Sequence, residues 1–230
     1  MATIAKTVGS FDKVLATCKQ IGAQYQPNVA SLSPAALSKL HDRAQQLVRV
    51  ASQAQTDHSL AVQERQKAFA DVTKLSVRIV RILSTSTQES AHLEAAKLIR
   101  NRFYSPRKKN VEEDNSVANN TRASGRMSYD QQLDTFTKLV DLIATTPAYS
   151  PVEPELAATT LRKKVISLRA HCQNLAEKHA IWKLACLERD QVVFGKNGIV
   201  MRARAVRDYI KGAFGSFSQQ AAQISSSLQL

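Results

Sequence analysis

One stretch of the chain occurs twice, and this constrains the fold more than any other feature. Residues 25–65 align without a gap on residues 149–189, and nine of the 41 aligned positions are identical. The identical pairs are Tyr25/Tyr149, Pro27/Pro151, Leu32/Leu156, Leu37/Leu161, Lys39/Lys163, Leu60/Leu184, Ala61/Ala185, Glu64/Glu188 and Arg65/Arg189. A copied stretch of this length predicts two halves that are built in the same way.

Apolar residues in the first half recur at helical spacing. They predict one amphipathic helix over residues 10–23 and a second that opens at Ser33-Pro34 and runs to about residue 55. A third is expected over residues 57–84 and a fourth over residues 87–103. Thr56-Asp57 is a weak break, so the second and third segments could also form one bent helix.

The second half restarts at Ser128, which has Gln131 three residues later as in a capping box. Glu153-Pro154 is expected to open the long helix of this half. The stretch from Gly195 to Gly198 predicts a turn, and a last helix is expected over residues 199–213. The Ser- and Gln-rich tail from residue 215 is expected to fray.

These patterns predict an all-α protein with two tandem, similar antiparallel bundles of three to four helices each. Only 7 glycines and 6 prolines occur, which favours long helices over sheets. The expected domains are a first helical unit at 1–103, a flexible basic and polar linker at 104–126, and a second helical unit at 127–230. The two bundles could lie side by side or pack into one longer bundle.

The formal net charge of +13 suits an acidic partner or simply a soluble basic protein. Cations interleaved with aromatic residues would fit phosphate contacts and base stacking. Glu112, Glu113 and Asp114 would partly cancel this charge, and Arg78, Arg81 and Arg202 would extend it. The candidate anion or nucleic-acid contacts are Lys97, Arg100, Arg102, Phe103, Tyr104, Arg107, Lys108, Lys109, Arg204 and Arg207.

The charged pair Glu64-Arg65 recurs as Glu188-Arg189. We interpret both pairs as structural, because a glutamate and an arginine at a helix edge form ion pairs that fix helix packing. The alternative is two equivalent acidic or anion-binding points. No histidine or second carboxylate repeats beside the pairs, which favours the structural interpretation.

No catalytic, cofactor-binding or metal-ligating residue is predicted. Cys172, His179 and Cys186 share one helical stripe, but seven residues of helix span about 10 Å, too far for ligands to one zinc ion. No phosphate-binding glycine loop, HExxH or CxxC motif occurs. An enzyme with a site assembled between the halves is the least favoured class.

The remaining sequence features bear on the compartment. The three cysteines fit buried thiols in a reducing environment, and no secretory signal or run of about 20 apolar residues occurs. These features predict a cytoplasmic protein without a transmembrane segment. Contact with an anionic membrane surface is the least favoured partnership.

The repeated Tyr25-x-Pro27, the segment from Leu32 to Leu37 (Leu-Ser-Pro-Ala-Ala-Leu) and Glu64-Arg65 together resemble a group of uncharacterised bacterial all-helical proteins with a tandem helical repeat and a variable linker. The resemblance covers nearly the whole chain, but it implies no activity, cofactor or functional residue. The leading functional hypothesis is a non-enzymatic helical scaffold or interaction protein that self-associates or binds another protein. The alternative is a nucleic-acid-binding protein that uses the basic residues.

Overall fold

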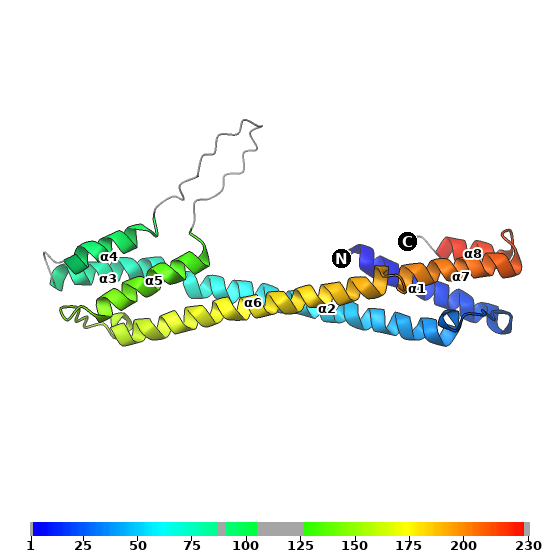
Figure 1. Ribbon diagram of the computed structural model, residues 1–230, viewed down its shortest axis with the longest axis horizontal. Coiled ribbons are helices and arrows are strands. Elements are labelled where there is room, and N and C mark those ends of the chain that lie inside the picture. Colours follow the sequence, from blue (N-terminus) through cyan, green and yellow to red (C-terminus); the bar gives the residue numbers. More distant parts are fainter. Residues whose placement is uncertain (1, 87–90, 105–126, 228–230) are drawn as a thin grey trace, which may run out of the picture. The chain divides into compact units, whose positions relative to one another are not determined.

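The computed structural model describes residues 2–86, 91–104 and 127–227 of the chain (Figure 1). Within these ranges the regular structure is entirely helical, which confirms the all-α prediction. The first half contributes four α-helices: α1 (Ala2–Ile21), α2 (Pro34–Phe69), α3 (Val72–Ser86) and α4 (Ala91–Asn101).

The second half also contributes four α-helices, of which the second is again the longest: α5 (Tyr129–Ala144), α6 (Ala158–Phe194), α7 (Ile199–Phe214) and α8 (Gln219–Ser227). Helices α2 and α6 are much the longest, with 36 and 37 residues. Each is preceded by a short 3-10 helix, η2 (Ala30–Leu32) or η3 (Pro154–Leu156). A third 3-10 helix, η1 (Gly22–Gln24), follows α1.

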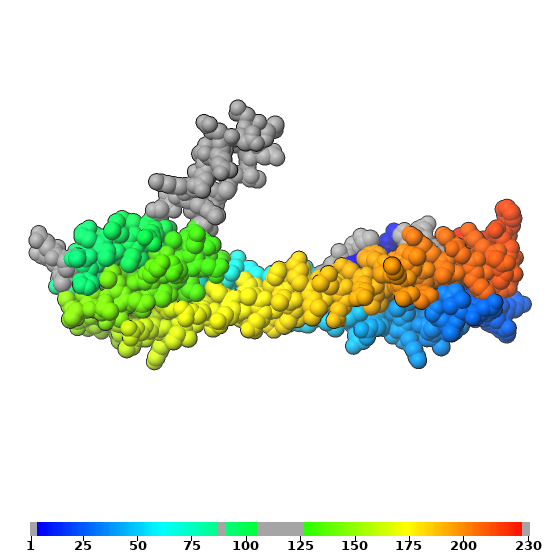
Figure 2. All heavy atoms as spheres, in the orientation of Figure 1, coloured from blue at the N-terminus to red at the C-terminus, as the bar shows by residue number. Residues whose placement is uncertain are grey.

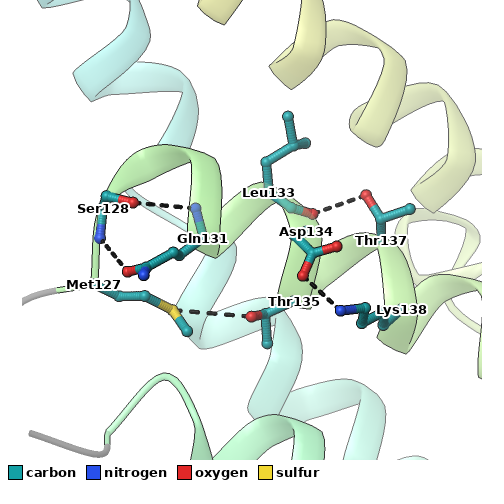
Figure 3. A network of polar contacts seen from close by, with 8 residues as sticks. All are labelled: Met127, Ser128, Gln131, Leu133, Asp134, Thr135, Thr137 and Lys138. Atoms are coloured by element: carbon teal, nitrogen blue, oxygen red, sulfur yellow. Dashed lines mark hydrogen bonds and ion pairs between the residues drawn. The ribbon is translucent and has the colours of Figure 1, made fainter. Parts of the chain in front are cut away.

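Two helix starts follow the capping signals that the sequence carries. The Ser33 side chain accepts a hydrogen bond from the backbone N–H of Ala36 at 3.3 Å, and Pro34 is the first residue of α2. At α5, Ser128 and Gln131 form a complete capping box, and Asp134 and Lys138 pair one turn further on (Figure 3). Helix α6 starts later than Glu153-Pro154, because η3 occupies that position.

The expected helix over residues 57–84 is wrong in its boundaries. Helix α2 continues through Thr56 and Asp57 and ends at Phe69, and α3 begins at Val72. The Thr56 hydroxyl donates to the carbonyl of Ser52 within the helix, at 3.1 Å. The Asp57 carboxylate accepts from Gln53 at 2.8 Å, so neither side chain caps a new helix.

The C-terminal tail is also more regular than expected. Gly215, at φ +89°, ends α7, and α8 then begins at Gln219. Ala221 and Ile224 of α8 are buried, and Ser218 caps the helix by accepting from the backbone N–H of Ala221 at 3.1 Å. The prediction that this tail frays is therefore wrong for residues 219–226.

The described chain divides into two compact units that do not coincide with the predicted domains 1–103 and 127–230. Unit 1 comprises residues 1–59 and 178–230, and unit 2 comprises residues 60–177. The divisions fall inside α2 and α6. A tandem arrangement of two separate bundles is therefore not confirmed.

Each unit combines helices from both halves of the chain. In unit 1, α1 from the first half packs against α7 and α8 from the second. In unit 2, α5 from the second half packs against α3 and α4 from the first. The exchange is reciprocal, because α1 and α5 occupy equivalent positions in the two halves.

Each apolar core contains side chains from both halves of the chain. The core of unit 1 joins Phe11 and Val14 of α1 to Val206 and Ile210 of α7, and all four are buried. The core of unit 2 joins Phe136 and Leu139 of α5 to Ile79 and Leu83 of α3, again all buried. A helix with one apolar stripe needs such partners to shield it from water.

The two Tyr-x-Pro connections adopt the same hydrogen-bonded structure. The buried Tyr25 hydroxyl donates to the carbonyl of Leu32 at 2.8 Å, and the buried Tyr149 hydroxyl donates to the carbonyl of Leu156 at 2.9 Å. Each bond joins the start of the connection to the 3-10 helix before the long helix. The aligned stretches therefore share local structure as well as residues.

Burial of Tyr149 predicts a loss of stability in alkali. Burial raises the pKa of Tyr149 to about 12, above its ordinary value of 10, so the folded state keeps its proton while the unfolded state loses it. Stability should be complete below about pH 10 and should fall as pH rises toward about 12. Chemical unfolding at several pH values, with phenolate absorbance followed alongside, measures this.

The matched variant for this prediction is Tyr149→Phe. It should lose about 0.5–1.5 kcal/mol of stability at neutral pH, because the Leu156 carbonyl loses its donor. Between pH 10 and 12, its free energy of unfolding should also fall much less than that of the natural protein. An unchanged alkaline decline in this variant would show that other groups cause it. Burial also raises the pKa of Tyr25, so Tyr25→Phe is the parallel test.

Candidate interaction face on α6

One side of α6 packs in the core of unit 1. Ala185 packs with Ala51 and Ala54 of α2, and Trp182 and Cys186 pack beside them. Further along, the buried Val193 joins the larger core of the unit. The α2 side chains that meet Ala185 at this point are both alanines.

Another side of α6 exposes large apolar side chains that this fold does not use. The exposed fractions are 53% for Ile181, 59% for Leu184, 68% for Leu187 and 50% for Phe194. In the space-filling view, α6 side chains are uncovered on the face shown (Figure 2). We call the following exposed residues the α6 face: Ala180, Ile181, Leu184, Leu187, Gln191 and Phe194.

The spacing of the α6 face is that of a coiled-coil seam. Residues 180, 184, 187, 191 and 194 are separated alternately by four and three positions, which is the heptad pattern of a helix that packs along another helix. Leu184 and Gln191 occupy the first position of the heptad, and Ala180, Leu187 and Phe194 occupy the fourth. Helix α6 thus has apolar residues on two sides.

The corresponding positions of α2 provide an internal comparison. At the offset of 124, Leu184 corresponds to Leu60, which is also exposed, but Leu187 corresponds to Gln63. Phe194 corresponds to Ala70, just after the end of α2. Ala180 and Ile181 correspond to Thr56 and Asp57. The fold is built with a largely polar face on α2, so the apolar face on α6 is not a general requirement of such a helix.

Two charged residues of opposite sign flank the α6 face. Lys183 is exposed, and its Nζ lies 5.3 Å from the ring centroid of Trp182. Glu188 is exposed and forms no ion pair with any residue that the structure describes. Glu188 therefore has no cationic partner among the described residues, whereas the exposed Lys183 contacts the Trp182 ring.

Leu184 and Leu187 belong to the apolar pattern of the α6 sequence, yet both side chains are exposed. The same holds for Leu60, which is 52% exposed, and for Leu98 of α4, which is 67% exposed. The sequence signal that could have identified the α6 face is the contrast between Leu187 and its repeat counterpart Gln63.

The two repeated Glu-Arg pairs differ in their surroundings. The Arg65 guanidinium lies over the Tyr129 ring, 4.4 Å from its centroid, within unit 2. Arg189 instead pairs with its neighbour Asp190 at 2.8 Å. Within the described ranges, neither Glu64 nor Glu188 forms an ion pair. The two arginines thus have different neighbours, and the structural interpretation of the repeated pairs stays a prediction.

The residues of the Cys172–His179–Cys186 stripe have separate neighbours. His179 lies beside His58 of α2, with ring centroids 5.4 Å apart, and His58 stacks on Trp182 at 5.0 Å. Cys186 belongs to the alanine cluster, while Cys172 packs in the core of unit 2. In the described ranges, no group of three or more histidine, cysteine, aspartate or glutamate side chains could hold a metal ion.

The proposed nucleic-acid contacts are only partly brought together. Lys97 pairs with Glu94 at 2.7 Å, Arg100 donates to Asn101 at 2.8 Å, and Arg207 pairs with Asp208 at 3.0 Å. Phe103 packs against the core of unit 2, whereas Arg102, Tyr104 and Arg204 are exposed. Lys97, Arg100, Arg102, Phe103 and Tyr104 lie in or just after α4, in unit 2, and Arg204 and Arg207 lie on α7, in unit 1. Arg107, Lys108 and Lys109 lie outside the described residues.

Unit 2 also has an open cavity of about 380 Å³. Its aromatic walls include Phe69 and Tyr129, whose rings meet edge to face with centroids 5.0 Å apart. The remaining lining is uncharged and half polar: Gln66, Ala70, Thr73, Phe103, Met127 and Gln132. No titratable side chain other than the Tyr129 phenol lines it, so it offers no acid–base pair.

Among the described residues, no helix has the length and apolar character needed to cross a membrane. Comparisons with known proteins complete the description of the chain. No family model, no curated protein and no solved structure matches it. The resemblance to uncharacterised bacterial helical proteins therefore stays a prediction.

Proposed function

We propose that this protein is a non-enzymatic helical scaffold that self-associates through the α6 face. The observation that carries the proposal is the exposure of Leu184 and Leu187 in a heptad pattern on a helix whose counterpart, α2, is largely polar there. Contiguous exposed apolar residues are typical of surfaces that bind another protein. A helix with a heptad seam binds most naturally to a second helix.

A second copy of the chain is the partner that the α6 face fits. The face carries its own complementary charges, because Lys183 and Glu188 flank its leucines with opposite signs. Two identical faces can therefore satisfy both charges when they meet. In self-association, both surfaces of the interface are the same known face. A face that packs on its own copy forms a closed two-fold dimer.

The test is the double substitution Leu184→Glu and Leu187→Glu in the full chain. Burying a leucine contributes about 1.5–3 kcal/mol, so the loss of two leucines from each copy should weaken association by at least about 100-fold. Sedimentation velocity over a range of protein concentrations measures this. The helix content should not change, because both side chains are exposed.

The chain offers a matched control. Leu60→Glu changes the repeat counterpart of Leu184, which has a similar exposure of 52%. This variant should associate like the natural protein. If the natural protein is monomeric at every concentration, or if Leu60→Glu has the same effect as the α6 variants, the proposal is wrong.

A further inference from the structure

We infer that the second copy lies parallel to the first, with α6 against α6 in register, and that Lys183 of each copy pairs with Glu188 of the other. This inference rests on the proposed function, because it specifies the orientation and the contacts of the proposed dimer. Three observations on the α6 face carry it: the heptad positions of the charges, the place of Gln191, and the existing partner of Asp190.

The spacing of the two charges is that of a parallel pair. With Leu184 in the first position of the heptad, Lys183 precedes it and Glu188 follows Leu187. In parallel two-stranded coiled coils, residues at these flanking positions, five apart in sequence, meet across the interface and set the orientation. Lys183 of one copy therefore reaches Glu188 of the other, and the two-fold axis repeats the contact.

The two charges cannot satisfy each other within one helix. Residues five apart point in different directions on an α-helix, whereas residues three or four apart lie side by side. Glu188 also forms no ion pair with a described residue. A second copy supplies a cation for Glu188 and a carboxylate for Lys183.

An antiparallel pairing matches these residues less well. In an antiparallel pair, each flanking heptad position meets the same heptad position of the other helix. Lys183 would then meet Asp190, and Glu188 would meet the apolar Ile181. Asp190 already has Arg189 at 2.8 Å, which makes it a weaker partner for a second cation. The carboxylate of Glu188 would lie against an apolar side chain without compensation.

Gln191 supports the same orientation. In the parallel arrangement, the Gln191 side chains of the two copies face each other, and a carboxamide can both donate and accept. A matched polar pair of this kind fixes the register of a coiled coil. In the antiparallel arrangement that pairs Leu184 with Leu187, Gln191 would face Ala180, which offers no hydrogen bond.

Charge exchange tests the ion pairs. Lys183→Glu alone and Glu188→Lys alone should each weaken self-association about 5- to 20-fold, because two attractions become two repulsions. The double variant Lys183→Glu/Glu188→Lys should recover most of the loss. An equimolar mixture of the two single variants should also recover it by forming heterodimers.

Cysteine cross-linking tests the orientation in the full chain, in a background with Cys172→Ala and Cys186→Ala. In the parallel register, Ala180→Cys should form a disulfide between copies, because position 180 faces itself. The matched control, Thr56→Cys, changes the repeat counterpart on α2 and should stay monomeric under the same oxidation. Far-UV circular dichroism verifies that each variant is folded.

The outcomes separate this inference from the proposed function. Failure of Leu184→Glu/Leu187→Glu to weaken association would overturn both. If those substitutions abolish association but the charge-exchanged double variant stays weak, the parallel register alone is wrong. Cross-linking between an Ala180→Cys chain and a Gln191→Cys chain, without cross-linking of Ala180→Cys to itself, would identify the antiparallel dimer and overturn the inference.

Discussion

Residues 1–103 and residues 127–230, expressed as separate fragments, are each expected to lack a cooperatively folded monomeric state. In the first fragment, Phe11 and Val14 of α1 would lose Val206 and Ile210, which cover them in the whole chain. In the second, Phe136 of α5 would lose Ile79 and Leu83. A helix whose apolar stripe faces water has little stability of its own.

Mixing the two fragments should restore the helix content and a cooperative thermal transition, because each supplies the helices that the other lacks. Circular dichroism during a temperature ramp, with sedimentation to establish the mass, measures both effects. A cut introduced between residues 104 and 127 of the folded chain should likewise leave the pieces bound to each other. A fragment that unfolds cooperatively as a monomer would support the tandem bundles predicted from the sequence and contradict the exchange.

Phe136→Ala is expected to destabilise unit 2 by about 3–5 kcal/mol. The side chain is fully buried, and its removal takes away both the transfer free energy of the ring and the contacts that line the resulting cavity. A loss of this size is a large part of the stability of a domain of ordinary size. Chemical denaturation of the full chain at neutral pH measures the change.

The control for Phe136→Ala is Phe217→Ala, because Phe217 is fully exposed in the segment before α8. Its removal should leave the free energy of unfolding unchanged within about 0.5 kcal/mol. Comparable losses in the two variants would contradict the placement of Phe136 in the core.

The local features of the fold could be predicted from the sequence. Ser128 and Gln131 form the expected capping box, and Ser33 caps the expected helix, because such signals act over three residues. The break expected at Thr56-Asp57 failed for a related reason. A threonine hydroxyl can bond the carbonyl four residues earlier in mid-helix as readily as it can cap a new helix, so the residue type alone does not decide.

The exchange of helices could not be predicted in the same way. The spacing of Phe11 and Val14 shows that α1 has an apolar stripe, but it does not say which helices cover that stripe. A tandem bundle and an exchanged pair bury the same residues. Helix α8 was missed because Ala221 and Ile224 are too few to give a clear period among Ser and Gln residues.

The candidate face on α6 could not be predicted from the sequence of this helix. With apolar residues on two sides, the periodicity of α6 does not separate the buried Ala185 from the exposed Leu184 beside it. The packing of Ala185 against Ala51 and Ala54 in the structure identifies the inward side.

The reciprocal placement of α1 and α5 has a consequence for how the fold is completed. Either half alone would leave its first helix without the helices that cover it, because α1 packs against α7 and α8 while α5 packs against α3 and α4. Since both halves belong to one polypeptide, the encounter between them is intramolecular, and completion of the fold does not depend on protein concentration.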